Sequence, residues 1–67
     1  MPLPTVNTSH IPLKSRKAAF AALVAAQDGG ATVPASRQAV AEEYGLQVWD
    51  VASIEEEGLK KGWPPLD

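Results

Sequence analysis

The side chains that could support catalysis or metal binding are few, and their spacing suits neither purpose. His10 is the only histidine, and the chain contains no cysteine. Glu42 and Glu43 are adjacent, so on a helix they would project about 100° apart, and we interpret them as a solvated face rather than an acid and base pair. Gly29-Gly30 lacks the preceding strand and the lysine of a phosphate-binding loop. We therefore expect neither an enzyme nor a bound cofactor or metal ion.

Nine residues have side chains suited to holding a partner, and they form two groups. The basic group could contact phosphates of a nucleic acid. The second group lies within one short segment, residues 47–53. There Gln47 could pair with adenine, and Trp49 could anchor a protein interface. The basic group is Lys14, Arg16, Lys17 and Arg37, and the second group is Gln47, Val48, Trp49, Asp50 and Ser53.

Both groups of residues must be positioned by helices. Residues 15–27 are predicted to form the first helix. Ser15 can cap its start, alanine dominates its interior, and Gly29-Gly30 ends it. Phe20 and Leu23 lie on one stripe and are the expected core anchors. The opposite side is mostly alanine, which either tolerates water or forms a second contact surface, such as the interface of a homodimer.

Residues 34–44 and residues from 47 or 48 to near 60 predict two further helices joined by a tight turn. Pro34 stands near the start of the second helix, with Ser36 as its expected cap. Gly45 can adopt the left-handed conformation that ends this helix without steric cost. The chain is thus predicted to be all-α, a small three-helix bundle whose last two helices have the layout of a helix-turn-helix unit.

The third helix is predicted to have one apolar side and one outer side. Trp49 and Asp50 fall on or near the outer side, although a rotated helix would instead place the Trp49 ring in the core. Gly58 either loosens the last turn or allows another element to pack closely. The expected buried residues are Val48, Val51, Ile54 and Leu59.

The charge balance argues against strong non-specific attachment to nucleic acid. The net charge is −2, from eight acidic and six basic side chains, and most of the acids lie in the second half of the chain. Two pairs, Glu56 with Lys60 and Glu57 with Lys61, have the spacing that supports a helix. Part of the acidic run is therefore explained without a binding role.

The two ends are rich in proline, and we expect one domain, residues 14–67, preceded by an extended arm, residues 1–13. The arm is either a loose tail or a segment that lies along a partner or the domain's own groove. The C-terminal tail contains Trp63-Pro64-Pro65. Trp63 and Leu66 either fold back onto the helices or dock into another protein.

Targeting signals are not apparent in the sequence. Residues 1–13 lack the basic start and continuous apolar core of a signal peptide. The longest apolar run spans residues 18–26, far short of the roughly 20 residues of a membrane helix. We expect a cytoplasmic protein that does not associate with membranes.

The segment Val40-Ala41-Glu42-Glu43-Tyr44-Gly45-Leu46, followed by Val51, Ile54-Glu55 and Leu59, resembles the helix-turn-helix of region four of bacterial sigma factors, which reads a promoter element. The resemblance covers about a third of the chain at the level of a motif. It implies a transcription-associated domain whose third helix faces DNA. This chain departs from the family in that helix, because residues 47–53 contain none of the arginines and lysines of the family's reading surface.

Two functions are compatible with these features. The first is a helix-turn-helix subunit of a transcription or nucleoprotein complex, with weak or complex-assisted binding of duplex DNA through the third helix. The second is a module that keeps the helix-turn-helix scaffold but binds a protein subunit of a larger assembly. Trp49 favours the second, because a large ring at an exposed position is typical of an interface anchor.

Overall fold

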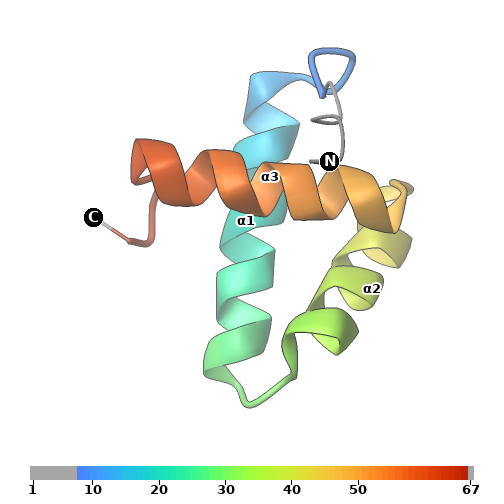
Figure 1. The fold of residues 1–67 in the computed structure, drawn as a ribbon, viewed down its shortest axis with the longest axis vertical. Coiled ribbons are helices and arrows are strands. Elements are labelled where there is room, and N and C mark those ends of the chain that lie inside the picture. Colours follow the sequence, from blue (N-terminus) through green and yellow to red (C-terminus); the bar gives the residue numbers. More distant parts are fainter. Residues whose placement is uncertain (1–7, 67) are drawn as a thin grey trace, which may run out of the picture.

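The computed structural model describes residues 8–66, and these residues form three helices and no strand. The helices are α1 (Leu13–Asp28), α2 (Val33–Tyr44) and α3 (Val48–Lys61). Helix α3 lies across α1, and α2 packs beside them, so that each helix contacts both others (Figure 1). The all-α prediction is confirmed.

The starts of α1 and α2 differ from the prediction, because proline shifts both boundaries. Pro12 precedes α1 and no side chain caps this helix, so Ser15 lies inside it. Pro34 occupies the first turn of α2, where a missing N–H costs little, and the helix therefore begins before it. Thr32 is the true cap, because its side chain accepts a hydrogen bond from the Ala35 N–H at 3.2 Å. The two predicted serine caps, Ser15 and Ser36, are wrong.

The end of α2 agrees with the prediction. Gly45 has φ 65° and ψ 35°, the left-handed conformation, and its N–H donates to the Ala41 carbonyl. The N–H of Leu46 donates to the same carbonyl at 2.8 Å, and the Leu46 side chain packs against the core. These two bonds occupy a carbonyl that the helix end would otherwise leave unpaired, and they turn the chain toward α3.

One cluster of apolar side chains forms the core between the helices. Phe20, Leu23, Val51 and Ile54 are almost completely buried, as predicted. Val48 and Leu59 are 45% and 59% exposed, so their predicted burial is wrong. Residues 51, 54 and 58 already fill the side of α3 that faces α1 and α2, and positions 48 and 59 project away from that side.

Gly58 and Trp63 complete the core at the C-terminal end of α3. A Cβ at Gly58 would overlap the Phe20 ring, so the glycine allows α3 to approach α1 closely, which was one of its two predicted roles. Trp63 is 6% exposed and meets Phe20 edge to face, with ring centroids 6.0 Å apart. The tail therefore folds back through Trp63, whereas Leu66 is 48% exposed and does not take part.

The predicted N-terminal arm lies mostly outside the described residues. At its described end the Ile11 N–H donates to the Thr8 carbonyl at 2.9 Å, so these residues form a turn and not the predicted extended arm. Ile11 is 5% exposed and joins the core, while Leu13 already belongs to α1 and is exposed. The first helix thus begins two residues earlier than predicted.

Candidate interaction surface on the third helix

The start of α3 exposes three of the five residues of the second predicted group. Gln47 and Val48 are exposed, Trp49 is 58% exposed, and Ser53 is half-buried. Successive residues of an α-helix are about 100° apart, so Trp49 lies almost opposite Val51 and Gly58, which are both buried. The alternative in which the Trp49 ring forms part of the core is wrong.

Asp50 does not lie on this surface. It is only 6% exposed, and its Oδ2 accepts a hydrogen bond from the Gln47 backbone N–H at 3.3 Å. This contact is the carboxylate half of a capping box, and a negative charge is favourable at a helix N-terminus. The predicted outward position of Asp50 is therefore wrong, because the residue serves to begin α3.

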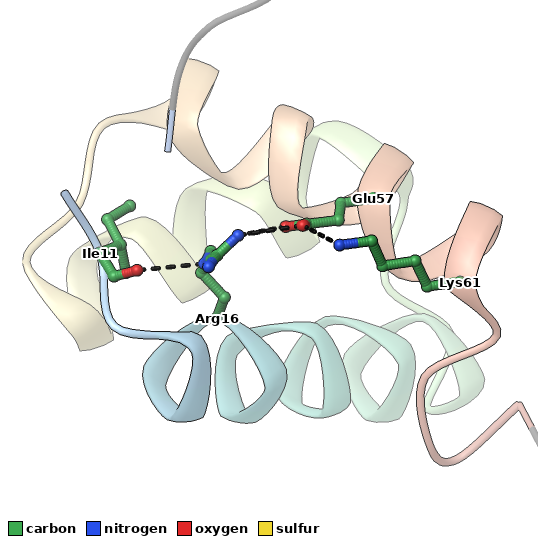
Figure 2. A network of polar contacts seen from close by, with 4 residues as sticks. All are labelled: Ile11, Arg16, Glu57 and Lys61. Atoms are coloured by element: carbon green, nitrogen blue, oxygen red, sulfur yellow. Dashed lines mark hydrogen bonds and ion pairs between the residues drawn. The ribbon is translucent and has the colours of Figure 1, made fainter. Parts of the chain in front are cut away.

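Arg16, one of the predicted phosphate contacts, is ion-paired within the fold (Figure 2). Its Nη1 lies 2.8 and 3.0 Å from the two carboxylate oxygens of Glu57, and its Nε donates to the Ile11 carbonyl at 3.0 Å. Lys61 approaches the same carboxylate at 2.8 Å, which confirms the predicted pairing of Glu57 with Lys61. The network joins the N-terminal turn, α1 and α3.

The two cations lower the pKa of Glu57. The hydrogen bond from Lys61 is the largest cause, partial desolvation opposes it, and the hydrogen bond and charge of Arg16 reinforce it. The Glu57 carboxylate therefore stays ionised to a lower pH than an ordinary glutamate, whose pKa is 4.5. Arg16 could contact a phosphate only by giving up or sharing this partner.

Arg37, the second predicted arginine, is also ion-paired. Its Nη2 and Nε lie 2.6 and 2.9 Å from Glu55 Oε1, so the pair fastens α2 to α3. Gln27 donates to the other oxygen of Glu55 and to Ser36 Oγ, each at 3.1 Å, which extends the link to α1. Ser36 is fully buried and donates to the Val33 carbonyl at 2.8 Å. The sequence did not indicate this partly buried polar link, because its members are far apart along the chain.

The remaining predicted cations, Lys14 and Lys17, are exposed on α1. Lys17 Nζ lies 6.0 Å from the centroid of the Trp63 ring, and Lys61 Nζ lies 5.8 Å from it. These distances suit cation–π contacts. The predicted basic cluster is thus divided, with Arg16 turned toward Glu57 and Lys17 toward Trp63.

A shallow pocket of about 270 Å³ lies between the N-terminal turn and the turn that joins α2 to α3. Its lining combines apolar side chains with the polar groups of His10, Ser15 and Tyr44. It was not foreseen from the sequence, since it depends on how the N-terminal turn rests against α2. Within the described residues, no three histidine, cysteine or acidic side chains are grouped so that they could hold a metal ion.

Comparisons with protein-family models, with curated protein sequences and with solved structures find no match to this chain. Within residues 8–66 no helix has the length and apolar character needed to cross a membrane.

Proposed function

We propose that this chain is a small binding module on a helix-turn-helix scaffold, and that it attaches to a protein subunit of a transcription or nucleoprotein assembly through the outer surface of α3. It acts by binding and not by catalysis. The resemblance of residues 40–59 to sigma-factor region four supports the scaffold and its setting. Short helices joined by the Gly45 turn are consistent with that scaffold.

The observation that carries the proposal is the exposure of Trp49 on a helix whose opposite side is fixed in the core. A tryptophan that is 58% exposed presents a large apolar surface to water, while Val51 and Ile54 on the opposite side of α3 are 0% exposed. A rigid helix can offer this ring to a partner with little loss of conformational entropy. Tryptophan is also among the residues that most often dominate binding energy in protein interfaces.

The charges support a protein partner over DNA. Arg16 and Arg37, which could have neutralised phosphates, are already paired with Glu57 and Glu55. Helix α3 carries one aspartate, three glutamates and two lysines, and so has a net charge of −2, from four acidic and two basic residues. A helix with this charge would be repelled by the phosphate backbone.

Weak or complex-assisted binding of duplex DNA is the second candidate, and the burial of Asp50 favours it. Because that carboxylate caps α3, it does not stand among Gln47, Trp49 and Ser53, which would face the bases in a helix-turn-helix complex. Exposed Lys14 and Lys17 could supply phosphate contacts. Few such contacts are available, so binding would need a larger complex.

A pull-down from an extract of the source cells, with and without nuclease, separates the two candidates. We expect a protein to be retained after nuclease treatment by the unaltered chain and lost with Trp49→Ala. We expect no measurable binding to random duplex DNA at physiological salt. A micromolar or tighter complex with duplex DNA, with affinity that falls steeply as salt rises, would instead establish the DNA candidate.

A further inference from the structure

The outer side of α3 carries a defined pattern of apolar and charged residues. Trp49 and Leu59 are its large apolar groups, 58% and 59% exposed. Ten residues of α-helix separate them by about 15 Å, and Glu56 lies between them, within about 20° of Trp49 around the helix axis. We call Trp49, Ala52, Glu56, Leu59 and Lys60 the α3 ridge.

Glu56 differs from the glutamates on either side of it. Glu55 pairs with Arg37 and Glu57 with Arg16 and Lys61, so both are engaged inside the fold. Glu56 is exposed and makes no ion pair with any residue in the range 8–66, and the predicted pair with Lys60 is not formed. The ridge therefore presents one carboxylate between two apolar groups.

A second copy of the chain is a poor occupant for the ridge. In an antiparallel pair of α3 helices, the register that sets Trp49 against Leu59 of the other copy has its two-fold axis at position 54. Each Glu56 would then lie about 3 Å along the helix from that axis, which brings two like charges into the centre of the contact. The register that sets Glu56 against Lys60 has its axis at position 58 and leaves Trp49 beyond the end of the partner helix.

We propose that the α3 ridge binds a different protein, whose surface offers an apolar pocket to Trp49 and, about 10 Å away, a lysine or arginine to Glu56. The charge complementarity fixes the position of the ridge on the partner, and the apolar groups supply most of the affinity. This inference rests on the proposed function, because it specifies the partner of the same surface.

The test is a charge series in the nuclease-treated pull-down, with Glu56→Gln, Glu56→Lys and Trp49→Ala beside the unaltered chain. Asp28→Lys is the matched control, since it makes the same charge change at the exposed C-terminal end of α1. Far-ultraviolet circular dichroism checks that each variant is folded. A carbodiimide, which joins a carboxylate to an amine in direct contact, is added to the complex, and mass spectrometry locates the linked residues.

We expect Trp49→Ala to weaken retention by about 30-fold, Glu56→Gln by about threefold, and Glu56→Lys by more than about tenfold because it opposes like charges. Asp28→Lys should bind as the unaltered chain does. When the partner residue is a lysine, the cross-link should join it to Glu56. When it is an arginine, no cross-link forms at Glu56, and the charge series alone carries the test.

A partner that depends on Trp49 but is retained equally by Glu56→Lys would overturn this inference and leave the proposed function intact. A dimer in sedimentation analysis that is lost with Trp49→Ala would overturn it in favour of a second copy. If no nuclease-resistant partner depends on Trp49, both this inference and the proposed function are wrong.

Discussion

The contact between Gly58 and Phe20 sets how closely α3 approaches α1, and Gly58→Ala would disturb it directly. A Cβ at this position would overlap the Phe20 ring, which is completely buried and packed against Trp63. In a helix interior, alanine is more favourable than glycine by about 1 kcal/mol. Forcing an extra methyl group into a packed core costs about 1 to 3 kcal/mol. Because three ring atoms are overlapped and the ring is completely buried, we expect the upper part of that range.

The net effect should be a loss of about 1 to 2 kcal/mol in the free energy of unfolding. A domain of this size has a total of about 3 to 10 kcal/mol, so the loss is a large share. The melting temperature should fall by about 5 to 15 °C. Thermal and urea unfolding, followed by circular dichroism at 222 nm, measure both quantities.

Gly29→Ala is the matched control. Gly29 has φ −78°, and an added Cβ would meet only ordinary contacts at 3.5 Å, so alanine should be neutral or should stabilise by about 0.4 to 1 kcal/mol. The double variant Phe20→Leu with Gly58→Ala should lose less than the sum of the two single variants, because the smaller side chain vacates part of the overlapped space. If Gly58→Ala raises the melting temperature as Gly29→Ala does, α3 is not held against α1 by this contact.

Three further outcomes follow from the structure. Trp49→Ala should leave the melting temperature nearly unchanged, whereas Trp63→Ala should cost about 3 to 5 kcal/mol or prevent folding; equal losses in thermal unfolding would show that Trp49 is a core residue. Asp50→Ala should cost about 0.5 to 2 kcal/mol through loss of the cap, measured by urea unfolding, and no loss would contradict the capping contact. The pKa of Glu57 is lower in the folded state, so its contribution is complete above the ordinary value of 4.5 and disappears as pH falls through the folded-state pKa. Glu57→Gln should therefore be less stable than the unaltered chain at pH 7 and equal to it well below that pKa, and a difference that persists in strong acid would contradict this assignment.

The sequence by itself determined the elements of this fold. Alanine content, apolar spacing and the left-handed glycine at position 45 are local signals, and they predicted three helices and the turn that separates α2 from α3. They also predicted that Phe20 and Ile54 are buried. The helix starts were less certain, because a proline or a serine near a boundary is compatible with several starting residues.

The tertiary structure alone decided which charges are available to a partner. Arg16 and Glu57 are 41 residues apart, and Arg37 and Glu55 are 18 apart, so no local pattern indicates that they pair. No local pattern indicates the rotation of α3 about its axis either. This rotation buries Asp50 and exposes Val48 and Leu59. Helical periodicity defines the faces of a helix, but contacts between helices determine which face is covered. For this chain that choice leaves Trp49 and Glu56 facing outward.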